Sequence, residues 1–244
     1  MPYPPAPATL DVDGRALPVE GIIAALAPHV LQTRLARMEG VLAHRLASLA
    51  LGVEDLHHSH NGHACLRTAE ALGLQDVVAA ELRHAYPLDD AAAEPEVNRK
   101  ISMAAHRWID LHRVDDSAAL LAFARARDMR VFGAGPRGAL TLDALPLDRP
   151  ALLLFGNERE GLRDDTLAAC DDAFRIPMYG FCESFNVSVS VGITLAATTA
   201  RIRARLAADG RTGDLPADRR RHLLARWLLG DVRGAPSIIR RRLG

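Results

Sequence analysis

From about residue 50 to residue 207, short apolar runs alternate with stretches of helical spacing, and this alternation constrains the fold more than any other feature. The apolar runs are LALGVEDL, DVVAAEL, WIDLHRV, MRVFGA, ALLLFG and DAFRIPM, each about as long as one strand. The predicted helices fall at 61–73, 97–106, 116–128, 164–170 and 187–207. Strands that alternate with helices form parallel sheets covered on both faces. The sequence therefore predicts an α/β fold.

The segments on either side of this alternation differ in character. Residues 1–18 are rich in proline and are expected to form a disordered tail. The next segment carries apolar side chains at helical spacing and is expected to form a short and a longer helix separated at Pro28. Near the C-terminus, a helix is expected at about 216–229, before an arginine-rich end. The predicted domain organisation has four parts: 1–18, 19–49, 50–207 and 208–244.

The composition is that of a globular protein, with 49% hydrophobic and 25% charged residues. No apolar run approaches the ~18 residues that span a bilayer. The first residues lack the basic and apolar regions of a secretory signal. The three scattered cysteines form neither a disulfide framework nor a metal-binding pattern. We therefore expect a cytoplasmic protein with reduced thiols and no membrane segment.

The charge is distributed unevenly along the chain. Lys and Arg number 30 and so do Asp and Glu, which makes the formal net charge zero. Residues 201–244 nevertheless contain twelve arginines and four aspartates, so this end is +8 and the remainder is −8. Such asymmetry favours a polyanionic partner for the basic end, although a solvated helix surface rich in Arg and Asp explains it as well.

Two motifs suggest ligands that the surrounding sequence does not support. GAGPRG at 133–138 fits G-x-G-x-x-G, but the segment that follows is too short for the amphipathic helix of a dinucleotide site. Its glycines still allow a loop to approach another group closely. The cluster of His57, His58, His60 and His63 lacks the cysteine or carboxylate ligands at fixed spacing that zinc sites usually add. We therefore expect no bound metal.

Polar residues follow two predicted strands. In HNGHACLRTAEALGL, residues 60–74, Asn61 is expected to cap a helix. Arg67, on the same helix, can point into the crevice where open α/β sheets bind ligands. In LLLFGNEREGL, residues 152–162, a buried strand ends just before Glu158. Active-site residues favour such strand ends, although a simple helix cap and a solvated turn remain alternative interpretations.

A third polar segment, FRIPMYGFCESFNVSVSVGITLA, spans residues 174–196. Its strand ends near Pro177, which has no backbone donor, and Gly180 allows a sharp bend. Ser184 and Asn186 then lie beside a helix of small residues. The alternative interpretation is a tight helix-packing site without chemistry.

Together and in this order, the three segments resemble the three motifs of the SpoU–TrmH RNA 2′-O-ribose methyltransferases of the SPOUT superfamily. The matching residues are Asn61, Ala64 and Arg67 for N-x-x-A-x-x-R; Gly156, Asn157 and Glu158 for G-x-E; and Ile176, Pro177, Met178, Gly180 and Ser184 to Ser188 for I-P-M-x-G and S-[LF]-N-V-S. The resemblance covers about residues 30–205. One departure is Phe185, which stands where leucine is common.

The resemblance implies a parallel-sheet SPOUT methyltransferase domain with a C-terminal trefoil knot, flanked by N- and C-terminal helical extensions. It also implies a homodimer that binds S-adenosylmethionine through the knot loops. The implied cofactor-binding residues are Ala134, Gly135, Gly156, Asn157, Ile176, Met178, Gly180, Phe185 and Asn186. The basic tail is similar to the C-terminal extension of the tRNA-acting branch.

The implied activity is methylation of a ribose 2′-hydroxyl in RNA, most simply of guanosine in tRNA. The implied site residues are Arg67, Asn61, Glu158, Ser184 and Asn186, with RNA bound by Arg67, Arg219, Arg220, Arg221, Arg226, Arg240 and Arg241. A guanidinium does not lose its proton near neutral pH, so Arg67 is either a base perturbed by the substrate phosphate or an electrostatic positioner. The alternative functions are methylation of ribosomal RNA and non-catalytic RNA binding.

Overall fold

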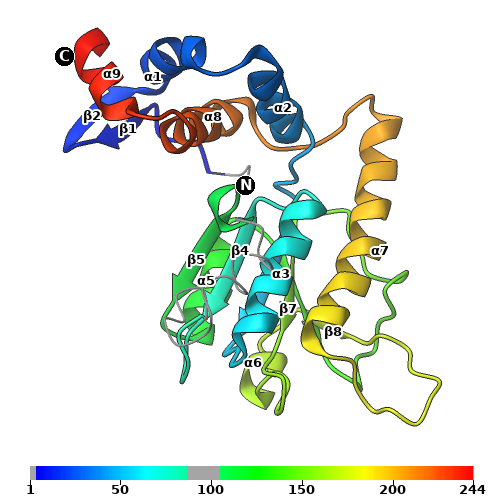
Figure 1. Ribbon diagram of the computed structural model, residues 1–244. Coiled ribbons are helices and arrows are strands. Elements are labelled where there is room, and N and C mark those ends of the chain that lie inside the picture. Colours follow the sequence, from blue (N-terminus) through cyan, green and yellow to red (C-terminus); the bar gives the residue numbers. More distant parts are fainter. Residues whose placement is uncertain (1–3, 87–104, 244) are drawn as a thin grey trace. The chain divides into compact units, whose positions relative to one another are not determined.

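The structure is a computed structural model that describes residues 4–86 and 105–243 (Figure 1). Within these residues the chain divides into two compact units. Unit 1 contains the described residues from 46 to 211, and unit 2 combines residues 4–45 with 212–243. The two terminal segments, which the sequence predicts as separate extensions, thus belong to the same unit.

Unit 1 is built on a six-stranded sheet with the order β5-β4-β3-β7-β6-β8 (Figure 1). Every pairing in this sheet is parallel. The strands are β3 Leu49–Glu54, β4 Asp76–Ala80, β5 Asp110–Val114, β6 Arg130–Ala134, β7 Ala151–Phe155 and β8 Asp172–Phe174. Each strand lies in one of the six predicted apolar runs, so the predicted α/β fold is confirmed.

The helices of unit 1 agree with the predicted ranges within a few residues. They are α3 Ser59–Ala71, α5 Ser117–Ala126, α6 Asp164–Ala168 and α7 Val187–Ala208, with a short 3₁₀ helix, η2, at Ala105–Arg107. Most of the helix predicted at 97–106 lies outside the described residues. The expectation that Asn61 caps its helix is wrong, because α3 begins at Ser59 with His58 in the capping position.

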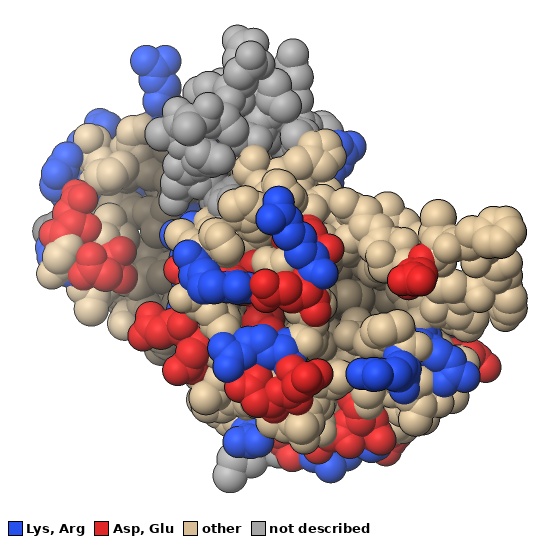
Figure 2. All heavy atoms as spheres, turned by 90° about the horizontal axis from the view of Figure 1, so that it is seen from below, with Lys and Arg blue, Asp and Glu red and all other residues tan. Residues whose placement is uncertain are grey.

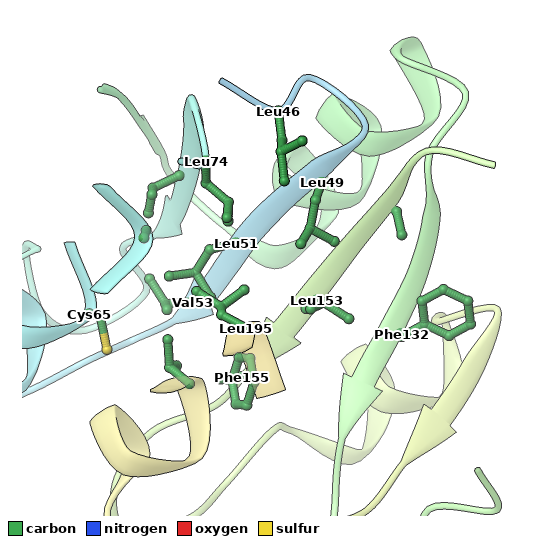
Figure 3. Close-up of a cluster of buried hydrophobic side chains, with 14 of the residues drawn as sticks. Leu46, Leu49, Leu51, Val53, Cys65, Leu74, Phe132, Leu153, Phe155 and Leu195 are labelled. Atoms are coloured by element: carbon green, nitrogen blue, oxygen red, sulfur yellow. The ribbon is translucent and has the colours of Figure 1, made fainter. Parts of the chain in front are cut away.

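The core of unit 1 has one layer on each face of the sheet. Leu153 and Phe155 of β7 pack with α3 and α7, where Leu195 is buried (Figure 3). Leu152 and Leu154 face the opposite way and pack with Leu120 and its neighbours on α5. A strand covered on both faces has no polar side, which explains the unbroken apolar run of β7.

The connection between β6 and β7, residues 135–150, contains no helix. It lies against β8 and α7, which follow it in the chain. A Cβ on Gly138 would stand 2.2 Å from the carbonyl carbon of Phe174. The guanidinium of Arg201 donates to the carbonyls of Leu142 and Leu145, both at 2.7 Å. The G-x-G-x-x-G match therefore lacks its dinucleotide-binding context, and Gly138 serves close packing within the chain itself.

Unit 2 begins with an antiparallel hairpin of β1 Thr9–Val12 and β2 Arg15–Pro18. Its turn is Asp13-Gly14, with φ of 53° and 79°, a combination that favours two-residue hairpins. The expectation of a disordered tail over residues 1–18 is therefore wrong for residues 9–18. The helices of this unit are α1 Val19–Leu26, η1 Ala27–His29, α2 Gln32–Ala43, α8 Ala217–Asp231 and α9 Ala235–Leu243.

The apolar face of α8 is covered within unit 2. Leu223, Leu224, Trp227 and Leu228 are at most 3% exposed. Helix α8 packs against α1 and α2, so both ends of the chain contribute to one core. This face is therefore not available to a second copy of the chain. Among the described helices, none combines the length and the apolar character that crossing a membrane requires.

Candidate active site

The carboxyl ends of β3 and β7 and the loop after β8 lead to three polar side chains that contact one another. Asn61, near the start of α3, donates through Nδ2 to Oε1 of Glu158 at 2.8 Å. Asn186, the residue before α7, donates through Nδ2 to Oδ1 of Asn61 at 3.1 Å. Because all the strands are parallel, their carboxyl ends share one edge of the sheet, where open α/β folds bind ligands. One residue from each of the three motifs is thus brought into a single hydrogen-bonded network.

Glu158 is the acceptor at the centre of this network. Besides Asn61, the backbone amides of His57 and His58 donate to its carboxylate, each at 3.1 Å. These amides immediately precede α3, where a helix has unpaired donors and a positive dipole end. Burial raises the pKa of Glu158, but the hydrogen bonds from Asn61 and the two amides lower it more, so the pKa lies below its ordinary value. Glu158 is therefore an ionised hydrogen-bond acceptor at neutral pH.

Asn186 caps α7 as well as contacting Asn61. Its Oδ1 accepts from the backbone amide and the hydroxyl of Ser188, at 2.8 and 2.7 Å. With both ends of the amide occupied, the side chain is held in one orientation. Ser184 lies two residues earlier and is exposed, and within the described residues no hydrogen bond joins it to the network.

Arg67 shares α3 with Asn61 but lies on a different face of the helix. At 3.6 residues per turn, a separation of six residues places the two side chains roughly 120° apart around the helix. Asn61 is 5% exposed, whereas Arg67 is an exposed residue. The side chain that the motif assigns to the reaction therefore faces outward, where a large substrate can reach it.

The loops after β6 and β8 offer open backbone at the carboxyl ends of the strands. An added Cβ would meet nothing closer than 3.7 Å at Gly135 and nothing within 4 Å at Gly180. The loop after β8, which extends below and beside the sheet in Figure 1, exposes the aromatic side chains of Tyr179, Phe181 and Phe185. Accessible backbone next to exposed aromatic rings fits a nucleoside with an apolar face. Ala134, Ile176 and Met178 lie on these same segments.

Two of the predicted cofactor-binding positions serve the fold of their own turn. Asn157 donates through Nδ2 to the carbonyl of Asp55 at 2.7 Å, and its Oδ1 accepts from the amide of Arg159 at 2.9 Å. A Cβ on Gly156 would stand 2.0 Å from the carbonyl carbon of Gly161. Only the backbone of Gly156 is therefore available to a ligand, because the backbone amide and carbonyl of Asn157 are paired with Gly161.

The arginines predicted to bind RNA, other than Arg67, belong to unit 2, which carries twelve arginines and seven acidic residues and is therefore +5. Arg221 is ion-paired with Glu20, and Arg240 with Asp13 at 3.4 Å. Arg219, Arg220 and Arg226 are half-buried on α8, and Arg241 is exposed on α9. Figure 2 views the molecule from below, where the loops of unit 1 lie in Figure 1, and on that face acidic and basic side chains are interspersed.

The histidine cluster makes ring contacts. The ring of His57 lies 4.8 Å from that of His58 and 4.4 Å from that of His84. In the part of the chain that the structure describes, no three His, Cys, Asp or Glu side chains are placed to hold a metal ion.

One functional candidate, Asp55, is missing from the residues singled out in the sequence. It is 3% exposed, directly follows β3 and has a positive φ of 53°. The sequence feature that could have identified Asp55 is its position as an acidic residue at the end of a buried apolar run.

Comparison with known proteins identifies the family whose members share this sequence and architecture. The family model of the SpoU rRNA methylase family matches residues 48–196. The tRNA (guanosine(18)-2′-O)-methyltransferase of Borreliella burgdorferi is 29% identical over 74% of this chain and 79% of its own length. The 23S rRNA (guanosine-2′-O-)-methyltransferase RlmB of Pseudomonas aeruginosa is 34% identical over 72% of this chain and 68% of its own.

Solved structures agree with this match. The crystal structure of the TrmH/SpoU tRNA modifying enzyme of Aquifex aeolicus superimposes with a TM-score of 0.69 and 25% identity, over 83% of this chain and 98% of that one. The fold and the matched motifs define a methyltransferase that uses S-adenosylmethionine as methyl donor. The chain belongs to the SpoU rRNA methylase family.

Proposed function

We propose that this methyltransferase modifies a ribose 2′-hydroxyl in RNA, with guanosine in tRNA as its substrate. The observation that carries the proposal is the Asn61–Glu158–Asn186 network, which joins all three motifs at the edge of the sheet where ligands bind. The named relatives support it, because they methylate the ribose of guanosine in tRNA or in 23S rRNA.

The bound donor supplies an electrophilic methyl group, so the protein has to align the hydroxyl with it and remove one proton. In this proposal the ionised Glu158 fixes the amide of Asn61, and Asn61 and Asn186 shape the ribose side of the site. Ser184 contributes to the floor of the site. Arg67 acts on the RNA by orienting the phosphate and ribose, or as a base perturbed by that phosphate; its exposure supports contact with RNA and suits both roles.

The donor site is assigned to the loops after β6, β7 and β8. The residues proposed to line it are Ala134, Gly135, Gly156, Asn157, Ile176, Met178, Gly180, Phe185 and Asn186. The open backbone at Gly135 and Gly180 supports this assignment. Gly156 contributes through its backbone only, since close packing leaves no room for a side chain. Asn157 contributes by holding this turn in place, since its side chain and its backbone are hydrogen-bonded within the chain.

We further propose that these loops form a trefoil knot and that the enzyme is a homodimer. The bonds from Arg201 to Leu142 and Leu145 support the knot, because they tie the β6–β7 connection to a helix that follows it in the chain. The exposed apolar side chains of Tyr179 and Phe181 support the dimer, because a second copy would remove them from water.

A tRNA substrate is favoured over ribosomal RNA by the Aquifex tRNA modifying enzyme, of which this chain covers 98%. The RNA-binding surface is proposed on unit 2 with Arg219, Arg220, Arg221, Arg226, Arg240 and Arg241, supported by its charge of +5. Free Cys65, Cys170 and Cys182 suit a reducing compartment and support a cytoplasmic location.

The test compares the wild-type chain with Arg67→Ala and Arg67→Lys. S-adenosylmethionine should bind all three proteins equally by calorimetry, because Arg67 acts on the RNA side. Methyl transfer to unmodified tRNA should be lost in both variants, since lysine lacks the planar guanidinium fork. Wild-type rates in Arg67→Lys would reduce the role of Arg67 to a generic positive charge. Failure of the wild type to bind S-adenosylmethionine would overturn the proposal itself.

A further inference from the structure

Asp55 makes hydrogen bonds to three segments near the carboxyl ends of the strands: the end of β4, the loop after β4 and the turn after β7. Its backbone amide donates to the carbonyl of Ala80 at 2.8 Å, which extends the pairing of β3 with β4. Its own carbonyl accepts from Nδ2 of Asn157 at 2.7 Å. The left-handed backbone at this position is one that aspartate tolerates better than most residues. The backbone of Asp55 thus links β3 to β4 and to the turn that carries Glu158.

The buried carboxylate of Asp55 organises the loop after β4. Its Oδ1 accepts from the backbone amides of Arg83 and His84, at 2.8 and 2.9 Å, and lies 3.1 Å from Nδ1 of the His84 ring. Its Oδ2 accepts from Nε of Arg83 at 2.7 Å. Burial raises the pKa of Asp55, but these hydrogen bonds lower it more, so the pKa lies below its ordinary value. Asp55 is therefore a fixed anion that orients the guanidinium of Arg83.

The Nη atoms of the Arg83 guanidinium bind Glu160, which lies in the turn that carries Glu158. Nη1 and Nη2 of Arg83 donate to the two carboxylate oxygens of Glu160, at 3.2 and 2.7 Å. Paired hydrogen bonds of this kind fix direction as well as distance. The turn is closed by reciprocal backbone bonds between Asn157 and Gly161, at 2.9 and 3.1 Å. Glu158 lies between these two residues, so displacing Glu160 changes the angle at which Glu158 meets Asn61.

We propose that Asp55 and Arg83 are positioning residues for methyl transfer, which hold the Glu158 turn against Asn61 through the Asp55–Arg83–Glu160 bridge. The inference deepens the proposed function and relies on it for the reaction that the bridge serves. Neither residue is placed in contact with RNA or with the methyl donor. Their effect is on the orientation of Glu158, which in turn holds Asn61.

The outer part of the bridge can be broken without opening the core. The side chains of Arg83 and Glu160 are 54% and 60% exposed, and such surface pairs contribute little to stability. The pair of Arg149 and Asp128 provides a matched control, with 2.6 Å between the charged atoms and side chains 51% and 49% exposed. It lies at the amino-terminal ends of the strands, away from the site, because Asp128 precedes β6 and Arg149 precedes β7. Arg149→Ala therefore removes an equivalent ion pair far from the site.

The experiment uses the full chain with the variants Arg83→Ala, Glu160→Ala, the double variant and Arg149→Ala. We expect kcat to fall about 10- to 100-fold in the first three, because small misplacements in a site have effects of this size. The double variant should resemble either single variant, since both break one bridge. The melting temperature of Glu160→Ala should stay within about 4 °C of the wild type. Arg83→Ala and the double variant should melt lower, because they also remove the Nε donor to the buried carboxylate of Asp55, so all rates are compared well below the lowest melting temperature. Arg149→Ala should keep the wild-type kcat.

A second measurement is independent of the RNA substrate. Amide hydrogen exchange over residues 157–162 should become about fivefold faster in Arg83→Ala, the factor that corresponds to about 1 kcal/mol of local stability. Arg149→Ala should leave this segment unchanged. Asp55→Asn, which tolerates the same backbone but offers less negative charge to Arg83, should reproduce both effects.

The outcomes separate this inference from the proposed function. Wild-type kcat or unchanged exchange in Arg83→Ala, or an equal effect in Arg149→Ala, would overturn the positioning role. If the wild type methylates no RNA but exchange responds as predicted, the bridge still positions the turn, and the proposed RNA substrate is what fails.

Discussion

Replacing Gly156 with alanine should damage the site without introducing a new charge or removing a functional side chain. The added Cβ would lie 2.0 Å from the carbonyl carbon of Gly161 and 2.1 Å from the amide nitrogen of Leu162, whereas ordinary contacts begin at 3.4 Å. The turn between these residues must therefore retreat by about 1.4 Å. Because backbone atoms cannot swing aside as a flexible side chain does, we expect a loss of about 1–3 kcal/mol in the free energy of unfolding.

The same displacement moves Glu158 away from Asn61, so methyl transfer should fall by about 100-fold, the effect expected of a 1 Å misplacement. Gly135→Ala is the matched control for stability, because its Cβ would meet nothing closer than 3.7 Å. Urea unfolding followed by circular dichroism measures the first effect, and initial rates of methyl transfer measure the second. The reasoning is refuted if Gly156→Ala is as stable as Gly135→Ala and as active as the wild type.

Two further predictions concern acid sensitivity and the core. The pKa of Glu158 is lowered in the folded state, so its contribution to stability is present above the unfolded pKa and is lost as the pH falls through the folded pKa. Melting temperatures of Glu158→Gln should therefore fall less than those of the wild type between about pH 6 and about pH 3, and parallel curves would contradict this. Leu153→Ala removes a fully buried side chain of β7 and should lower the free energy of unfolding by about 2–5 kcal/mol in urea titrations. A loss below about 1 kcal/mol would contradict this, because it would mean that the surrounding core side chains fill the cavity.

The strands and helices of unit 1 could be predicted because their signals are local. A run such as ALLLFG contains its own evidence for a buried strand. The start of α3 could not be predicted in the same way. Its preceding amides at His57 and His58 bind Glu158, about a hundred residues later in the chain, so Asn61 is not needed as a cap.

Other features depend on partners that periodicity does not reveal. The hairpin of unit 2 was obscured by prolines, although Asp13-Gly14 is a turn signal. The importance of Asp55 arises from Arg83, Asn157 and Glu160, which three separate segments bring to one edge of the sheet. The three motifs identify the site through resemblance, whereas the hydrogen bonds that connect them become visible only in three dimensions.

The most direct test of the central claim is to locate the transferred methyl group. The purified chain is incubated with an unmodified tRNA transcript and with methyl-labelled S-adenosylmethionine, the RNA is digested to nucleosides, and the products are identified by mass spectrometry. The account predicts guanosine with the label on its ribose, at a yield that rises with time and is abolished by Arg67→Ala. Label on a base alone, or no label in the tRNA, would contradict it.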